Sequence, residues 1–317
     1  MRRPALVPLL LLPLVAAAAI AEERKLTITE STAVAADGTR IYYRVAGSGN
    51  DVVLAPFAVL HGAQLDGLAS AKRRIVTYDP RGRGRSATVP PEKVSLDLLL
   101  SDLEAVRKAV DAESIAIIGW SGGGMETFVY TLRNPDRVTR LVQLAPVGPR
   151  AGFEVVMRDR ERRTDAAARA KLRDEIERGA YASRDAELCR AQAAVVLPAT
   201  LADPARFDEL PDVCMHPNEW DANLGPYFGA LMASFGDYDW RPDIAKVTIP
   251  RLVLHGAQDN IPLASSEDWV RGAPNARLLV IENSGHWPAY EQQQQTLAAI
   301  DRFLNGEWPP GAKSIPR

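Results

Sequence analysis

The stretch Gly119-Trp120-Ser121-Gly122-Gly123 decides the interpretation of this 317-residue chain. It follows the apolar run from Ile115 to Ile118 and leads into a helical pattern, so a strand, a tight turn and a helix are expected in that order. A serine in such a turn stands clear of the backbone, and the start of the next helix offers N–H groups to an oxyanion. The pattern predicts that Ser121 is a nucleophile, although a glycine-rich turn with a chance serine has the same local sequence.

Two later strand ends carry the partners that a nucleophilic serine needs. The apolar run from Leu252 to Leu254 leads into a loop with Asp259, and the run from Leu278 to Ile281 leads into a loop with His286. A histidine can remove the serine proton, and a carboxylate can hold that histidine in the useful tautomer. We therefore expect Ser121, Asp259 and His286 to form a catalytic triad whose order along the chain differs from the two serine-protease orders.

Other titratable side chains near these loops are expected to be structural. Asp237, Asp239 and Asp243 compete with Asp259 but follow no predicted strand of the sheet. His255 ends a strand and is expected to make a structural hydrogen bond, because the base must come from a loop after the acid. The four histidines and two cysteines show no metal-ligand spacing, so neither a metal nor a cofactor is expected.

These landmarks resemble those of the α/β-hydrolase superfamily. The segment 78–86, which reads YDPRGRGRS, is a further landmark, and its arginines are expected to pair with carboxylates at the sheet edge. The landmarks are spread over nearly all of the chain after the N-terminal segment, and they are most similar to the proline iminopeptidase branch and its esterase relatives. The resemblance implies an α/β-hydrolase fold, in which a mostly parallel sheet has helices on both faces and an inserted helical cap.

The two oxyanion donors are expected from backbone N–H groups. One belongs to Gly122, the residue after the nucleophile. The other comes from the loop after the early strand Val52 to Ala55. Phe57 is the candidate there, because a turn at His61-Gly62 would leave too little chain for a helix before the next strand.

Aromatic residues near the predicted chemistry suggest a substrate pocket. Trp120 and Trp287 flank the nucleophile and the base, whereas Tyr227 and Trp240 belong to the expected cap. We expect all four to line an apolar pocket. For the two cap residues, ordinary packing between cap and core explains the aromatic side chains equally well.

The N-terminus has the pattern of a secretory signal peptide. Two arginines precede an apolar stretch that ends at Ala19-Ile20-Ala21, and Pro8 and Pro13 interrupt that stretch, which is too short for a spanning helix. We expect residues 1–21 to be removed and the protein to be secreted or periplasmic, without a stable membrane anchor. Cys189 and Cys214, the only cysteines, then form either one disulfide or two buried thiols.

Strand and helix patterns alternate along most of the chain, which predicts a mostly parallel sheet covered on both faces. The alternation stops between residues 150 and 241, where a charged helix-forming part is followed by a part with Pro and aromatic residues. The resemblance to α/β-hydrolases implies a helical cap at this point of the chain, so we expect a core of residues 22–149 and 242–317 and a cap of residues 150–241.

The expected function is that of a secreted serine hydrolase that cleaves an ester or amide bond in a small molecule or short peptide. Aminopeptidase activity of the proline iminopeptidase kind is a subcase, and it would need a carboxylate for the substrate amine, with Glu175, Glu177 and Glu187 as candidates. A cofactor-free oxygenase or haloperoxidase-like activity is the alternative, and a non-catalytic ligand-binding protein comes third. The net charge of −2 and the scattered arginines argue against a nucleic-acid partner.

Overall fold

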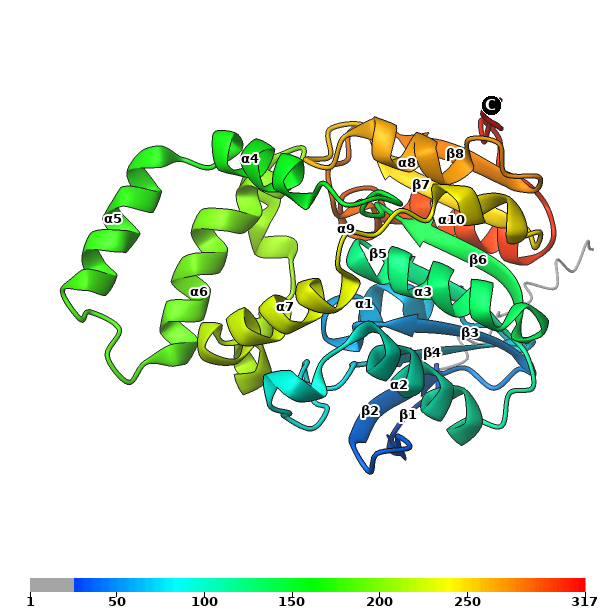
Figure 1. The fold of residues 1–317 in the computed structure, drawn as a ribbon, viewed down its shortest axis with the longest axis horizontal. Helices are drawn as coiled ribbons and strands as arrows, with labels where there is room; N and C mark the ends of the chain where they lie inside the picture. The colour runs from blue at the N-terminus through cyan, green and yellow to red at the C-terminus, as the bar shows by residue number, and fades with distance from the viewer. Residues whose placement is uncertain (1–25, 317) are drawn as a thin grey trace, which may run out of the picture.

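The computed structural model describes residues 26–316 and is built on one eight-stranded sheet (Figure 1). The strand order is β1-β2-β4-β3-β5-β6-β7-β8. β1 pairs antiparallel with β2 and β2 with β4, whereas all later neighbours are parallel. The fold class predicted from the sequence is confirmed. The strands are β1 (Ile28–Val34), β2 (Arg40–Ala46), β3 (Asp51–Pro56), β4 (Arg73–Tyr78), β5 (Ile115–Trp120), β6 (Val138–Leu144), β7 (Arg251–Gly256) and β8 (Ala276–Ile281).

Alternate residues of the central strands face opposite layers of helices, as the pleat of a strand requires. In β5, Ile115 and Ile117 join the core beneath α2, α3 and α8, and Ala116 and Ile118 join the core beneath α1 and α10. Strands buried on both faces need continuous apolar runs, which these strands have. The helices of the two layers are α1 (Ala58–Leu65), α2 (Leu96–Ala109), α3 (Gly122–Arg133), α8 (Leu263–Val270), α9 (Pro288–Glu291) and α10 (Gln293–Leu304).

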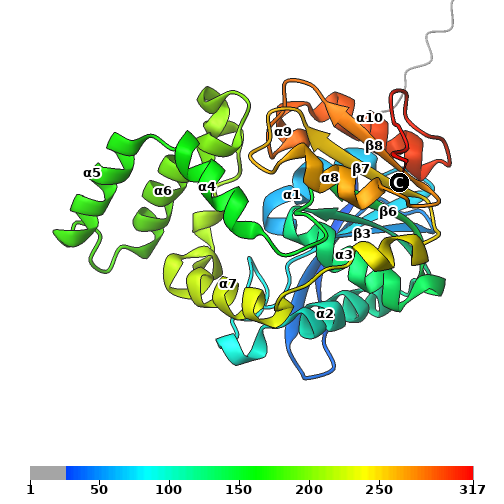
Figure 2. The same ribbon diagram turned by 45° about the horizontal axis from the view of Figure 1, so that its top comes forward.

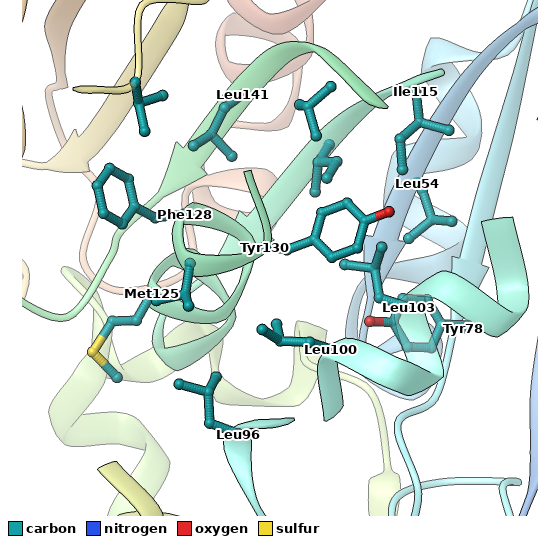
Figure 3. Packing of buried hydrophobic residues seen from close by; sticks show 14 of the residues in the cluster. Leu54, Tyr78, Leu96, Leu100, Leu103, Ile115, Met125, Phe128, Tyr130 and Leu141 are labelled. Atoms are coloured by element: carbon teal, nitrogen blue, oxygen red, sulfur yellow. The ribbon is translucent and has the colours of Figure 1, made fainter. Parts of the chain in front are cut away.

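Figure 3 shows how α2 and α3 cover the first of these cores, with Leu103 and Phe128 packed over the strands that carry Ile115 and Leu141. Helix α2 begins directly after Ser95, which caps it. The Ser95 hydroxyl accepts a hydrogen bond from the Leu98 N–H at 3.3 Å, which satisfies one of the free amides at the helix start.

Residues 150–241, the inserted segment, leave the sheet after β6 and return to it at β7. Figures 1 and 2 show its helices α4–α7 as a lobe that projects beside the sheet. The two ends of the segment are joined by backbone hydrogen bonds of 2.8 Å, from the Ala151 N–H to the Tyr238 carbonyl and from the Trp240 N–H to the Pro149 carbonyl. Its helices are α4 (Phe153–Arg163), α5 (Ala166–Glu177), α6 (Asp185–Val196) and α7 (Asp221–Phe235).

A disulfide between Cys189 and Cys214 fastens α6 to the short helical turn Val213–Met215. Of the two states that the sequence left open for these cysteines, the structure therefore has the disulfide. The predicted signal peptide, residues 1–21, lies outside the described residues. Within residues 26–316, none of the helices has both the length and the apolar character needed to cross a membrane.

Candidate active site

Ser121 lies in the sharp turn between β5 and α3. Its backbone has φ 54° and ψ −123°, a conformation that a residue other than glycine rarely adopts. The turn is held by backbone hydrogen bonds from the Ser121 N–H to the Leu144 carbonyl and from the Val147 N–H to the Ser121 carbonyl. Gly119 is needed here, because a Cβ at that position would lie 2.3 Å from the Thr127 hydroxyl oxygen. The turn directs the Ser121 side chain away from the sheet and toward His286.

His286 connects Ser121 to Asp259. Its Nε2 lies 3.0 Å from the Ser121 Oγ, and its Nδ1 lies 3.1 Å from each carboxylate oxygen of Asp259. The loop after β8 carries the histidine, and the loop after β7 carries the carboxylate, so both follow the carboxyl ends of neighbouring parallel strands. The structure thus brings together the three residues that the sequence selected, at distances that allow a proton to pass from serine to histidine.

Asp259 is buried and further held by its surroundings. The Ile261 N–H donates to its Oδ1 at 2.8 Å, and Arg163 of α4 donates to the backbone carbonyls of Gln258 and Asp259. The competing aspartates face other partners, since Asp239 pairs with Arg241 and Asp243 pairs with Lys246.

His255 makes the structural hydrogen bond that was expected for it. Its Nδ1 lies 2.9 Å from the Ser266 hydroxyl, and the imidazole is buried. Burial lowers the pKa of His255 below its ordinary value.

The loop after β3 places Phe57 at the start of α1, and His61-Gly62 lies inside that helix. Phe57 has φ 68° and ψ 56°, a left-handed conformation, and its ring lies against α3, where a Cβ on Gly123 would be 3.0 Å from the Phe57 Cε2. Among the loop and cap hydrogen bonds of residues 26–316, the Phe57 and Gly122 amides are not donors. Neither N–H group is therefore taken by one of these backbone bonds, and their role as oxyanion donors stays a prediction.

Two of the four predicted pocket residues lie beside the triad. The Trp120 ring centroid is 4.9 Å from that of His286, and its indole N–H donates to the His286 carbonyl at 2.8 Å. Trp287 packs on Trp120, and its own N–H donates to the Thr200 hydroxyl. Through these contacts the two tryptophans support the loop that carries His286.

The other two predicted pocket residues, Tyr227 and Trp240, each have packing partners of their own, and their place in a substrate pocket stays a prediction. Trp240 stacks on Tyr238 at 4.4 Å and lies 6.5 Å from Trp269, in the core that α3 and α8 cover. Tyr227 is buried with Val94 and neighbouring residues of α2 and α7. Both side chains pack where the inserted segment meets the core.

Sequence reasoning missed Glu291, the residue that fixes the histidine loop. Its buried carboxylate accepts from the Gly285 N–H at 2.7 Å and the Trp287 N–H at 3.3 Å, on either side of His286. Its other oxygen accepts from the Ala202 N–H of the inserted segment at 2.6 Å. The His286 N–H itself donates to the Thr200 carbonyl at 2.8 Å. The sequence signal that could have indicated this role is a glutamate five residues after His286, in a short helix.

His61 is a buried histidine behind the triad. Its ring lies 4.7 Å from the Trp120 ring and 5.6 Å from the Trp287 ring, and within the described chain neither of its nitrogens has a hydrogen-bond partner. Burial, with a smaller contribution from His286, lowers the pKa of His61 to about 3. The imidazole is therefore neutral near pH 7.

His61 makes the folded protein sensitive to acid. Because its pKa is lower in the folded chain than the ordinary 6.5, its full contribution to stability is present above pH 6.5 and is lost as the pH falls toward about 3. At pH 5 the loss amounts to about 2 kcal/mol. The free energy of unfolding, measured with urea, should fall between pH 8 and pH 5 by about 2 kcal/mol less in His61→Gln than in the original protein. His216→Gln is the comparison, because burial also lowers the pKa of this half-buried histidine; it should change the pH dependence less than His61→Gln does. An unchanged pH dependence in His61→Gln would contradict the assignment.

No group of three potential metal ligands occurs among residues 26–316. A groove of about 630 Å³ lies between α4, α5 and α6, and Ser121, Asp259 and His286 are not among the residues that line it. The site therefore consists of a serine hydroxyl in contact with a histidine that in turn contacts a buried carboxylate.

Comparisons with known proteins agree with this arrangement. The family model described as alpha/beta hydrolase fold matches residues 57–293, which include all three triad positions. The AB hydrolase superfamily protein YisY of Bacillus subtilis (strain 168) is 27% identical over 270 residues, covering 79% of this chain and 91% of its own. A proline iminopeptidase of Clostridium botulinum is 22% identical over 284 residues, covering 84% and 94%. The structure of an enol-lactonase from Burkholderia xenovorans LB400 is similar with a TM-score of 0.65 at 20% identity, covering 87% of this chain and all of the other.

Proposed function

Since this chain belongs to the α/β-hydrolase fold family, we propose that it is a serine hydrolase that cleaves an ester or amide bond through an acyl-enzyme on Ser121. The observation that carries the proposal is the continuous contact from the Ser121 Oγ to the His286 Nε2 and from the His286 Nδ1 to Asp259. A serine hydroxyl is a weak nucleophile, and this contact is what activates it.

In the proposed reaction His286 takes the Ser121 proton while the Oγ bonds to the substrate carbonyl carbon. Asp259 stabilises the imidazolium that forms. The carbonyl oxygen becomes negatively charged and accepts from the Gly122 and Phe57 N–H groups. His286 then gives its proton to the leaving alcohol or amine as the bond to that group breaks. A water molecule, deprotonated by the same histidine, releases the acyl group as a carboxylic acid and restores Ser121.

The inserted segment is proposed to act as a cap over this site. Thr200 and Ala202 of that segment contact the histidine loop directly, through the His286 N–H and through Glu291. Substrate groups remote from the reacting bond would therefore contact residues of the inserted segment. These contacts would determine which substrates are preferred.

An ester is proposed as the preferred substrate, with aminopeptidase activity as the subcase suggested by similarity to proline iminopeptidases. The three glutamates that the sequence offered for a substrate amine lie on the outer helices α5 and α6. Glu175 accepts from the Tyr181 hydroxyl, Glu187 pairs with Arg184, and Glu177 is exposed. Carboxylates in these positions are solvated or occupied, so they do not favour an amine site.

Turnover of p-nitrophenyl acetate and of proline p-nitroanilide tests this proposal, each compared with its rate in buffer. We expect the acceleration of the ester to exceed that of the anilide by about tenfold or more, because substrate preference reflects differential transition-state binding. A larger acceleration of the anilide would identify an aminopeptidase. If neither substrate is turned over and Ser121 resists a fluorophosphonate, the serine hydrolase proposal fails in favour of another chemistry or a binding protein.

A further inference from the structure

The oxyanion turn at Phe57 needs support from its surroundings. A left-handed backbone at a bulky residue is strained and persists only where neighbouring groups hold it. The Asp79 carboxylate provides one restraint, because its Oδ1 accepts from the Val59 N–H at 2.8 Å in the first turn of α1. Gly123 provides another by leaving room for the Phe57 ring.

A third restraint is the guanidinium of Arg83, whose central carbon lies 5.1 Å from the centre of the Phe57 ring. The same guanidinium contacts the rings of Tyr227 and Phe228 in α7, at 5.5 and 5.4 Å. A cation placed against aromatic rings away from water is attracted to them. The Phe57 ring is thus held between Gly123 on one side and Arg83 on another.

Arg83 is in turn held by Glu219, which belongs to the inserted segment. The Arg83 Nε and Nη2 donate to the two carboxylate oxygens of Glu219 at 2.9 and 2.7 Å, and both side chains are buried. The Gly84 N–H donates to the same carboxylate at 2.8 Å. Such a bidentate pair fixes the orientation of the guanidinium plane as well as its position.

The pair is anchored to the disulfide of the inserted segment. The Glu219 carbonyl lies 3.5 Å from the Cys189 Sγ, and the Trp220 indole N–H donates to the Cys214 carbonyl at 2.9 Å. A continuous set of contacts therefore runs from the disulfide through Glu219 and Arg83 to Phe57.

We infer that Arg83 and Glu219 are positioning residues that make the oxyanion turn at Phe57 dependent on the inserted segment. The inference rests on the proposed serine hydrolase function. When the segment is seated, Glu219 orients Arg83, and Arg83 holds Phe57 so that its N–H points at the developing oxyanion. When the segment moves, the turn loses this restraint and one donor of the oxyanion hole is misaligned.

The alternative is that the pair only stabilises the fold. A double variant separates the two roles. Arg83→Met alone leaves the Glu219 carboxylate buried without its charged partner and should lower Tm by about 5 °C or more. Arg83→Met combined with Glu219→Leu removes both charges, and a buried ion pair replaced by apolar residues usually regains stability.

The readout is kcat and KM on p-nitrophenyl acetate together with Tm. We expect kcat of Arg83→Met to fall by about 10- to 100-fold, somewhat less than when an oxyanion donor is deleted outright, with KM changed less than about threefold. In the double variant Tm should recover while kcat stays low. If kcat recovers together with Tm, the pair is only structural and the inference is overturned.

Asn218→Ala is the matched control at the same junction. Asn218 donates to the Gly84 and Ser86 carbonyls and accepts from the Thr88 hydroxyl, without contact to Phe57. It should lower Tm but leave kcat within about threefold of the original. An equal loss of kcat in this control would contradict a specific role for Arg83. Fluorophosphonate labelling of Ser121 in the unmodified protein is tested first, so that failure of the proposed function is recognised separately.

Discussion

Ser121→Ala should lower kcat by about 10⁴-fold or more while the protein stays folded. In the proposed reaction the acyl group is attached to the Ser121 Oγ. Without that oxygen no acyl-enzyme can form, and only the oxyanion donors and substrate binding remain to accelerate the reaction. Alanine fits the turn as well as serine does, because the Ser121 side chain caps no helix and contacts His286. The measurements are turnover of p-nitrophenyl acetate, the circular dichroism spectrum, and labelling by a fluorophosphonate followed by peptide mapping.

Ser266→Ala provides a matched control for this prediction. Like Ser121, Ser266 contacts a histidine, here His255 at 2.9 Å, and its side chain is buried. Because that pair is assigned a structural role, its loss should leave kcat within about threefold of the original. Modification of any serine other than Ser121, or full turnover by Ser121→Ala, would refute the assignment of the nucleophile.

The second large effect is expected for Asp259→Asn, which should lower kcat by about 10³- to 10⁴-fold. The Ile261 N–H donates to Oδ1 of Asp259, so an asparagine would keep its carbonyl oxygen on that amide and present its NH₂ group to His286. With that NH₂ group beside it, the Nδ1 of His286 loses the negatively charged acceptor for its proton, which favours the tautomer with the proton on Nε2. In that tautomer Nε2 cannot accept the Ser121 proton.

The matched control for the acid is Asp243→Asn. Asp243 competes with Asp259 in the sequence but pairs with Lys246 at 2.6 Å. Its replacement should leave kcat/KM unchanged, while Asp259→Asn should slow both turnover and fluorophosphonate labelling. A result in which Asp243→Asn is the impaired variant would mean that the acid has been assigned to the wrong loop.

The parts of the site that follow strand ends were predictable from the sequence, because they depend on local pattern. Ser121, Asp259 and His286 each come directly after an apolar run, and the parallel sheet brings such ends together. Phe57 was selected from chain length alone, since a helix must fit between it and the next strand. The loop 78–86 was expected to pair its arginines with the sheet edge. Arg85 does so with Glu30 of the edge strand β1, whereas Arg81 pairs with Asp102 of α2 and with Asp37 of the turn between β1 and β2.

The other contacts of the site depend on how the inserted segment packs against the core. This packing cannot be predicted from the local sequence pattern. Arg83 was expected to pair at the sheet edge and instead pairs with Glu219, 136 residues later in the chain. Tyr227 and Trp240 were assigned to a pocket because they are aromatic, but aromatic rings serve a junction equally well. In the sequence nothing distinguishes Glu291 from the other glutamates, because its three backbone donors are brought to it only by the fold.

The joined ends of the inserted segment have a consequence for the order in which the molecule is built. Leu141 of β6 pairs with Arg251 of β7, and closing the loop of about 110 residues between them costs on the order of 4 kcal/mol of chain entropy. The hydrogen bonds at Ala151 and Trp240 draw the two ends of that loop together once the segment has formed. With these ends joined, only a short stretch of chain separates each of them from β6 or β7, so we expect β7 to pair with β6 readily and β8 to pair next. Asp259 and His286 follow β7 and β8 along the chain, so we expect the three triad residues to come together only after these two strands have paired with the sheet.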